Sequence, residues 1–242
     1  MANAHYENVR LAQIFDPLDQ DRSDLDFYAA LVDALDARAV LDVGCGTGTF
    51  ACLLAQRDLD VVGLDPAAAS LDVARTKPGA DRVRWIHGDT REMPPLQVDA
   101  ATMTGNVAQV FVTDDDWVAT LRAIRQALRP GGHLVFESRV PEDQAWRRWT
   151  SEESRTRVEI SGVGTVDSWV EVTDVQGPLV SFHSTFVFDS DGATLTSDST
   201  LRFRTRGELT ASLSEARLNV REIRDAPDRP GREFVFIARR PE

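Results

Sequence analysis

The sequence is poor in cysteine, in basic residues and in long apolar runs. Its 242 residues include two cysteines, Cys45 and Cys52. On a helix that rises about 1.5 Å per residue, these two positions lie roughly 10 Å apart, which is too far for a disulfide. We therefore expect two small buried thiols in a reducing compartment.

The shortage of positive charge and of apolar runs limits the partners of the chain. Lys and Arg total 27 against 39 Asp and Glu, so the formal net charge is −12. A nucleic-acid-binding surface requires the opposite sign, so we expect no nucleic acid partner. No apolar run approaches the ~18–20 residues of a membrane helix and there is no signal-peptide pattern, so we expect a soluble, cytoplasmic protein without membrane contact.

The most informative stretch is a glycine-rich turn. A short apolar run contains Asp42, and Gly44, Gly46 and Gly48 follow at alternate positions before a helical pattern. This arrangement is typical of nucleotide-binding turns, because glycine permits positive φ and the close approach of a ligand. A dinucleotide site would need glycine at the position of Thr49, which disfavours a nicotinamide oxidoreductase.

A second carboxylate, Asp65, follows the predicted strand 61–64. It comes about 20 residues after Gly44, the offset expected for an acid that binds ribose hydroxyls. Pro66 is predicted to open the next helix, in whose first turn proline is tolerated. Capping that helix is the alternative role of Asp65.

A third carboxylate, Asp89, follows the predicted strand 83–87, and Thr90 comes next. Together with the D-x-G-x-G-x-G motif that begins at Asp42, these acids resemble the cofactor site of class I S-adenosyl-L-methionine-dependent methyltransferases. The resemblance implies that the glycine turn lies under the methionine and ribose portions of the cofactor and that Asp65 binds the ribose. It implies that Asp89 and Thr90 contact the adenine edge, and it makes Pro66, directly after Asp65, a further candidate for cofactor contact.

The predicted strand 98–103 ends before Thr104 and Asn106, at a position that faces the transferred methyl group in this family. The family's Asn/Asp-Pro-Pro-aromatic motif is not found here, which argues against DNA adenine and several amide substrates. Thr104 and Asn106 are candidates for cofactor contact, and Asn106 also for substrate contact. The alternative role of Asn106 is that of a turn residue. Residues 128–136 resemble a later, structural motif of the family, and we expect a strand from His133 to Ser138. Arg139, just beyond that strand, is a candidate for the rim of the substrate pocket.

The N-terminal segment 1–36 is predicted to be a helical lid. Tyr28 lies on an apolar helical stripe between Leu25 and Leu35. The resemblance makes Tyr28 a candidate for cofactor contact, since methyltransferases often use a preceding helix as a lid. Core packing is the alternative.

Residues 141–203 differ in pattern from the rest of the chain. Three stretches alternate at period two, over 164–175, 179–189 and 193–203, with glycine-containing turns between them. Such an antiparallel insert is too long for a plain connection, so we expect a subdomain that covers the substrate. Its layout resembles that of small-molecule methyltransferases such as amino-sugar N,N-dimethyltransferases and glycine-N-methyltransferase-like enzymes.

Two residues of the insert are candidates for substrate contact, Trp146 and His183. His183 is also a candidate general base, because histidine titrates near neutrality. This hypothesis predicts that His183→Ala lowers turnover without changing cofactor affinity. The alternative is a surface strand residue.

The sequence thus predicts an α/β fold. Residues 1–140 and 204–242 form a Rossmann-like, seven-stranded, mostly parallel sheet with helices on both faces, and residues 141–203 form the β insert. The predicted function is methyl transfer from S-adenosyl-L-methionine to the N or O atom of a small molecule, with S-adenosyl-L-homocysteine as product and no metal. Orientation can supply much of such catalysis, so no nucleophilic side chain is required. A non-catalytic sensor or scaffold that binds the cofactor is the alternative, and a homodimer is compatible with the sequence.

Overall fold

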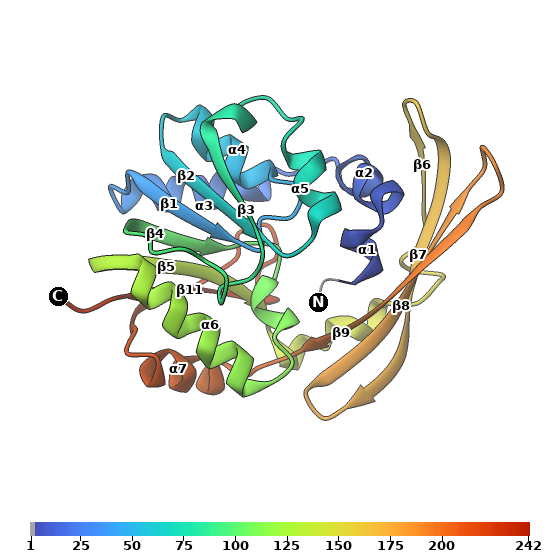
Figure 1. Ribbon diagram of the computed structural model, residues 1–242. Coiled ribbons are helices and arrows are strands. Elements are labelled where there is room, and N and C mark those ends of the chain that lie inside the picture. Colours follow the sequence, from blue (N-terminus) through green and yellow to red (C-terminus); the bar gives the residue numbers. More distant parts are fainter. Residues whose placement is uncertain (1–2) are drawn as a thin grey trace.

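The computed structural model describes residues 3–242 and contains two separate sheets, A and B (Figure 1). Sheet A consists, in spatial order, of β10 (Asn219–Asp225), β11 (Glu233–Arg239), β5 (Leu128–Arg139), β4 (Val98–Met103), β1 (Ala39–Val43), β2 (Asp60–Asp65) and β3 (Val83–His87). Sheet B consists of β6 (Thr156–Ile160), β7 (Gly164–Gln176), β8 (Leu179–Phe188) and β9 (Thr194–Arg202). The predicted Rossmann-like sheet with an antiparallel β insert is therefore confirmed.

Seven α-helices and four short 3-10 helices connect these strands in the described part of the chain. The α-helices are α1 (Ala4–Glu7), α2 (Val9–Leu18), α3 (Asp24–Ala34), α4 (Thr49–Gln56), α5 (Ala68–Ala74), α6 (Asp114–Ala127) and α7 (Arg206–Glu215). The 3-10 helices are η1 (Ala80–Arg82), η2 (Val107–Val110), η3 (Pro141–Asp143) and η4 (Ala145–Arg148). None of the helices within residues 3–242 is long and apolar enough to cross a membrane.

The strand directions in sheet A bring the predicted site residues to one edge. Strands β3, β2, β1, β4 and β5 pair in parallel, whereas β11 pairs antiparallel with both β5 and β10. Val43 pairs with Leu64, and Asp65 pairs with His87. The carboxyl ends of the first three strands therefore lie side by side, which is where open α/β sheets bind ligands.

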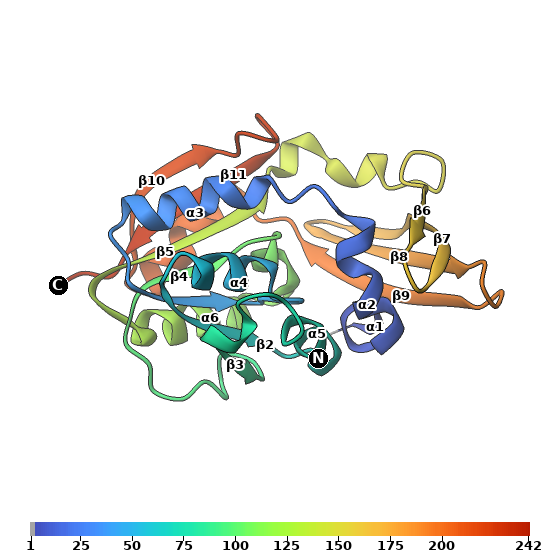
Figure 2. The same cartoon turned by 90° about the horizontal axis from the view of Figure 1, so that it is seen from above.

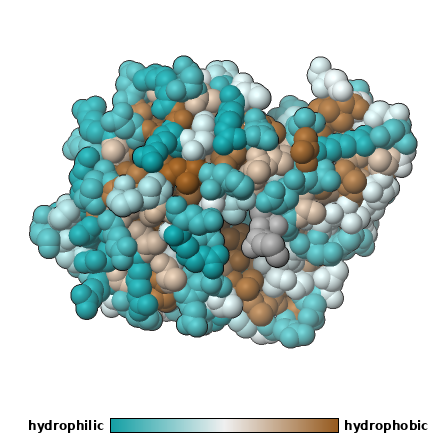
Figure 3. Space-filling view, in the orientation of Figure 1, coloured by the Kyte–Doolittle hydropathy of each residue, from teal (hydrophilic) through white to brown (hydrophobic). Residues whose placement is uncertain are grey.

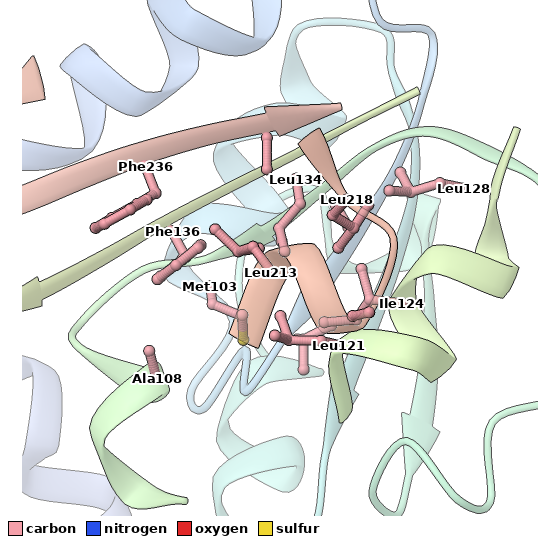
Figure 4. Close-up of a cluster of buried hydrophobic side chains, with 14 of the residues drawn as sticks. Met103, Ala108, Leu121, Ile124, Leu128, Leu134, Phe136, Leu213, Leu218 and Phe236 are labelled. Carbon is pink, nitrogen blue, oxygen red and sulfur yellow. The ribbon is translucent and has the colours of Figure 1, made fainter. Parts of the chain in front are cut away.

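Helices cover both faces of sheet A. Helices α6 and α7 pack on one face and α3 and α4 on the other (Figures 1 and 2). Figure 4 shows the cluster beneath α6 and α7, in which Phe136 of β5 and Phe236 of β11 stack with ring centroids 5.0 Å apart. Burial of each such side chain contributes about 1.5–3 kcal/mol, so this cluster rigidly fixes the strands that carry the site. Trp117 of α6 is fully buried in the same cluster.

The N-terminal helices lie between the two sheets. Both ribbon views place α1 and α2 between the carboxyl edge of sheet A and the concave side of sheet B (Figures 1 and 2). Leu11 and Ile14 of α2 are fully buried in one cluster with Phe186 and Phe188 of β8. In the space-filling view, apolar side chains show at this seam while most of the remaining surface is hydrophilic (Figure 3).

Three details differ from the sequence-based expectation. The strand β6 was not predicted; its residues alternate weakly, and it forms only by pairing with β7. The helix after β2 begins at Ala68, so Pro66 precedes it and does not lie in its first turn. The strand β5 begins at Leu128 rather than at His133, because the chain beyond β11 extends the pairing: Gly131 N–H donates to Arg240 C=O over 3.0 Å.

Candidate cofactor and substrate site

The three glycines of the turn after β1 have different roles. All three have positive φ, at 70°, 53° and 76° for Gly44, Gly46 and Gly48. A Cβ on Gly44 would lie 2.7 Å from Val107, and one on Gly48 would lie 2.5 Å from Trp85. Close packing therefore requires glycine at both positions. A Cβ on Gly46 would meet nothing within 4 Å. Gly46 is therefore the glycine that borders open space, which is what a ligand lying against the turn needs.

Asp65 is tied to that turn by its backbone. The Gly46 N–H donates to Asp65 Oδ2 over 2.8 Å, and the Ala67 N–H donates to Asp65 Oδ1 over 2.8 Å. Burial raises the pKa of the Asp65 carboxyl, while these two N–H groups act to lower it. Each carboxylate oxygen retains acceptor capacity for a further donor. Two such oxygens beside an open turn suit a pair of ribose hydroxyls.

The residue after Asp65, Pro66, is exposed, and its carbonyl oxygen lies 3.1 Å from His87 Nε2.

Asp42 is buried, and only one of its two carboxylate oxygens has a hydrogen-bond partner. Its side chain is 1% exposed, and its Oδ1 accepts from the Thr102 hydroxyl over 2.8 Å. Its Oδ2 is buried without a partner among the described residues. Burial raises the pKa of Asp42 to about 7, while the Thr102 hydrogen bond and the nearby Arg22 guanidinium act to lower it. An unpartnered carboxylate oxygen next to a glycine turn is suited to an ammonium group.

The third acid, Asp89, is more exposed and already engaged. It forms an ion pair with Arg91 and accepts the Arg91 N–H over 2.8 Å. These bonds hold the pKa of the Asp89 carboxyl below its ordinary value. Thr90 is buried, with its hydroxyl 3.4 Å from that of Thr120 on α6, which leaves its backbone as the part that can face a ligand.

The N-terminal helices close over the glycine turn through Asp16. Asp16 Oδ1 accepts from the Thr47 and Thr49 hydroxyls over 2.7 and 3.1 Å, and its Oδ2 lies 2.6 Å from Lys77 Nζ. Asp16 therefore connects α2 to the turn and to the chain after α5. Nothing in the sequence singles out Asp16, because only the fold brings it to the turn.

Tyr6, and not Tyr28, is the tyrosine associated with the cleft. Burial raises the pKa of Tyr6; the charge of Asp65 raises it further, and that of Arg139 lowers it, so the hydroxyl lies within the field of both groups. The ring of Tyr6 stacks on His5, with centroids 5.1 Å apart. Tyr28 is 1% exposed and donates its hydroxyl to Glu137. This geometry supports the packing alternative for Tyr28.

Asn106 is held by two buried acids. It has a left-handed backbone (φ 61°), and its N–H donates to Glu137 Oε1 over 3.0 Å. Its side-chain Nδ2 donates to Glu233 Oε1, also over 3.0 Å. Burial, followed by the charge of Glu233, raises the pKa of Glu137 to about 7. Thr104, two residues earlier, is partly buried at the end of β4.

Arg139 is on the opposite side of the same cluster. It donates to Gln109 Oε1 over 2.9 Å, and its Nε lies 3.9 Å from Glu233 Oε1. Burial lowers the pKa of its guanidinium, while Glu233 raises it. A pocket of about 140 Å³ opens beside Arg139. It is lined by four arginines and two acids together with an alanine and a tryptophan: Arg139, Asp143, Ala145, Arg148, Trp149, Arg229, Arg232 and Glu233. The lining is thus basic although the chain is acidic.

The two candidate residues of the insert, Trp146 and His183, are not among the residues that line the pocket beside Arg139. Trp146 packs edge-on against Phe203, with centroids 4.6 Å apart, in a small apolar cluster. His183 is on the face of β8 opposite to the buried Phe186, and its Nδ1 lies 2.8 Å from the exposed Asp198. Because successive residues of a strand point to opposite faces, the core contacts of Phe186 turn His183 away from the cleft. This geometry favours the alternative for His183, a surface strand residue, over the role of a base.

The described residues, 3–242, contain no group of three or more His, Cys, Asp or Glu side chains that could hold a metal ion. The structure does fit S-adenosylmethionine. Gly46 leaves space where a Cβ would stand, and Asp42 has an orphaned oxygen at the same turn. Asp65 adds acceptors for hydroxyl groups.

Comparisons with known proteins agree with this site. Residues 40–132 match the family model described as a methyltransferase domain. These residues contain the glycine turn and all three acids at the strand ends. The match covers less than half of the chain, and it identifies residues 40–132 as similar to a methyltransferase domain.

Two solved structures are similar over nearly the whole chain. An amino pentose methyltransferase from Micromonospora echinaspora, solved with S-adenosylmethionine bound, is 26% identical with a TM-score of 0.69, covering 91% of this chain and 93% of its own. DesVI from Streptomyces venezuelae is 22% identical with a TM-score of 0.77, covering 96% and 98% of the two chains.

Similarity to curated sequences is confined to part of the chain. A cypemycin N-terminal methyltransferase of Streptomyces sp. is 34% identical over 110 residues, which is 45% of this chain and 45% of that protein. The chain thus matches less than half the length of this relative.

Proposed function

We propose that this protein transfers a methyl group from S-adenosylmethionine to a small molecule. The observation that carries the proposal is the open space at Gly46, whose N–H is bound by Asp65, together with the unpartnered oxygen of Asp42 just before the same turn. The proposed roles are ribose binding by Asp65 and ammonium binding by Asp42. Arg22, which lies close enough to Asp42 to lower its pKa, is suited to the cofactor carboxylate.

When bound, the cofactor supplies an activated methyl group on a positively charged sulfur. The task of the chain is then to align the acceptor with that methyl group and to exclude water, and orientation of this kind can contribute about 7–11 kcal/mol. Asp16 holds the N-terminal helices over the turn through its hydrogen bond with Thr47. The insert closes the outer side through the contacts of α2 with Phe186 and Phe188. In this proposal the N-terminal helices and the insert together form the lid, and the basic pocket beside Arg139 receives the acceptor.

A small-molecule acceptor is supported by the restricted site. The pocket beside Arg139 measures about 140 Å³, too small for a folded macromolecule. The similar solved structures include an amino pentose methyltransferase and a sugar N-methyltransferase. Four arginines in the lining favour an acceptor that carries an acidic or strongly polar substituent.

The test is calorimetric titration with S-adenosylmethionine and S-adenosylhomocysteine, combined with a screen of S-adenosylhomocysteine release over amines, phenols and alcohols. We expect binding in the micromolar range and turnover of at least one acceptor. Asp65→Ala should weaken binding by about 100-fold, since charge-assisted hydrogen bonds contribute ~1.5–3 kcal/mol each. The matched control is the surface variant Asp72→Ala, which should bind normally. Unchanged affinity of Asp65→Ala would refute the ribose assignment, and binding without any turnover would favour a sensor or scaffold.

A further inference from the structure

Strand β10 leaves one edge of sheet A unpaired. It is the terminal strand in the spatial order of the sheet, and it pairs with β11 on one side only (Figure 2). No strand among the described residues, 3–242, pairs with its other side. The N–H and C=O groups along such an edge can pair with a strand of another chain. The pairing with β11 is regular from Glu222 to Asp225, and its one irregularity lies before Glu222.

The charges along β10 restrict what can pair with it. From residue 221 to residue 225 the chain reads Arg, Glu, Ile, Arg and Asp, and the four charged residues are exposed. Like charges that lie opposite each other on neighbouring strands are destabilising, so charges on an edge strand discourage pairing with an arbitrary strand. A strand that pairs with this edge must therefore present the opposite charge at each position.

A second copy of β10 meets this requirement in one register. Two identical antiparallel strands are related by a two-fold axis, so one residue lies opposite its own copy. With Ile223 at that position, Glu222 lies opposite Arg224 of the second copy. Arg221 then lies opposite Asp225 of the second copy, so both pairs have opposite charges. Any of the four charged residues at the axis would instead lie opposite its own like charge.

A groove of about 660 Å³ lies between β10 and α7. It is on the face of sheet A where Val220 and Ile223 pack against the apolar cluster beneath α6 and α7. On the α7 side the groove is lined mainly by small residues that share one face of the helix: Gly207, Thr210, Ala211 and Ser214. Small side chains leave room for a second helix to approach. A two-fold axis at Ile223 joins this groove to that of a second copy and turns the small-residue faces of the two α7 helices toward each other.

We propose that β10 forms a homodimer interface, in which two copies of the chain pair antiparallel about Ile223 and continue sheet A from one subunit into the other. Within one chain, Glu222 and Arg224 form an ion pair over 2.8 Å. In the dimer these two residues and their copies form a ring of four alternating charges beside the apolar Ile223. None of these residues lines the pocket beside Arg139, so the inference is independent of the proposed methyl transfer.

Sedimentation equilibrium of the full-length protein measures the association. We expect a monomer–dimer equilibrium with a Kd in the micromolar range, because one strand and one helix face make an interface at the small end of specific complexes. A wild-type protein that is still monomeric at roughly 1 mM would overturn the inference, since specific dimers associate well below that concentration.

Charge reversal tests the pairs. Glu222→Arg and Arg224→Glu should each raise the Kd of the dimer about ten-fold or more, because four like charges then meet at the axis. The two variants mixed in equal amounts should associate as the wild type does, since each arginine of one chain then lies opposite a glutamate of the other. The control is Arg84→Glu, an exposed position on β3 at the other edge of sheet A, which should dimerise normally. A dimer that both variants leave intact, or a mixture that fails to associate, would overturn the inference.

A cysteine at the axis tests the register. In Ile223→Cys the two thiols lie opposite each other, with Cα atoms about 4.5 or 5.5 Å apart, so mild oxidation should cross-link the dimer. In Arg221→Cys the two copies lie four residues apart along the paired strands, about 14 Å, which is too far for a disulfide. No cross-link in Ile223→Cys, or an equal cross-link in Arg221→Cys, would overturn the register. The cofactor affinity of all these variants should match the wild type, so a negative result here leaves the proposed methyl transfer intact.

Discussion

Gly46 and Asp65 are joined by a hydrogen bond of 2.8 Å from the backbone N–H of the glycine to the carboxylate Oδ2. The bond connects the turn after β1 with the acid that ends β2. Two parts of the proposed cofactor site are thereby held in a fixed relation before any ligand binds. Pre-organisation of this kind reduces the cost of ordering a site on binding.

We predict that Gly46→Ala weakens cofactor binding more than it weakens the fold. The added Cβ meets no protein atom within 4 Å, so the cost to stability is the strained backbone alone, about 1–2 kcal/mol. The same methyl group would enter the space proposed for the cofactor, so affinity should fall at least ten-fold. Gly48→Ala is the contrast: its Cβ would lie 2.5 Å from Trp85, so a large fall in Tm is expected. Normal cofactor affinity in Gly46→Ala would contradict the proposed cleft.

Ionisation of Asp42 should lower the thermal stability of the cofactor-free protein as the pH rises. Burial raises the pKa of this acid to about 7, from an ordinary value of 3.8. Between these two pKa values the folded state holds a proton that the unfolded state has lost, so the stability linked to it falls as the pH rises from about 4 to about 7 and levels off above that. We expect Tm to decrease by several degrees between pH 5 and pH 8 and the decrease to be smaller in Asp42→Asn. An identical pH dependence in both proteins would show that Asp42 is not responsible.

The same titration should have the opposite effect on cofactor affinity. Ionised Asp42 binds an ammonium group better than the neutral acid does, so the affinity for S-adenosylmethionine should rise between pH 6 and pH 8. In Asp42→Asn this rise should be lost. Calorimetric titrations at several pH values measure the effect, and a rise of equal size in the variant would argue that another group receives the ammonium.

Asp16→Ala should accelerate cofactor release. Asp16 connects α2 to Thr47, Thr49 and Lys77, and its removal leaves the N-terminal helices attached to sheet A mainly by apolar contacts. We expect the dissociation rate of S-adenosylhomocysteine in stopped-flow measurements to rise several-fold, with Tm little changed because the carboxylate is partly exposed. Asp19→Ala, on the same segment but exposed, is the control. Equal release rates in both variants would remove the closing role of Asp16.

His183→Ala should leave turnover unchanged. The sequence pattern predicts a loss of activity, but the structure turns this side chain away from the cleft and pairs it with Asp198 on the outer face of sheet B. The expected result is wild-type kcat and KM. A ten-fold lower kcat with normal Tm would return His183 to the mechanism.

The sequence predicts well those features that depend on neighbouring residues. The parallel strands and the β insert follow from local hydrophobic patterns and turn residues. The helix start at Thr205 is a further example, since both hydrogen bonds of its capping box with Glu208 form. Each of these structures is decided within about ten residues.

Local sequence patterns do not predict contacts between segments that are distant in the chain. Tyr6, Asp16 and Gln109 reach the site from three different segments, and nothing in their own neighbourhoods distinguishes them from surface residues. Glu233 is an acid near the C-terminal end of the chain that becomes 2% exposed only because Arg139, Arg229 and Asn106 surround it.

The sequence by itself determined the glycine turn, the acids at the strand ends and most of the strands, because these depend on backbone geometry and on alternation along the chain. Only the tertiary structure decided which side chains enter the cleft. The face of sheet B that packs on α2 excludes His183, and the pairing of β11 with β5 brings Glu233 to Asn106. The physical reason is that burial and partnership of a polar group are set by segments far away in the chain, which no local pattern encodes.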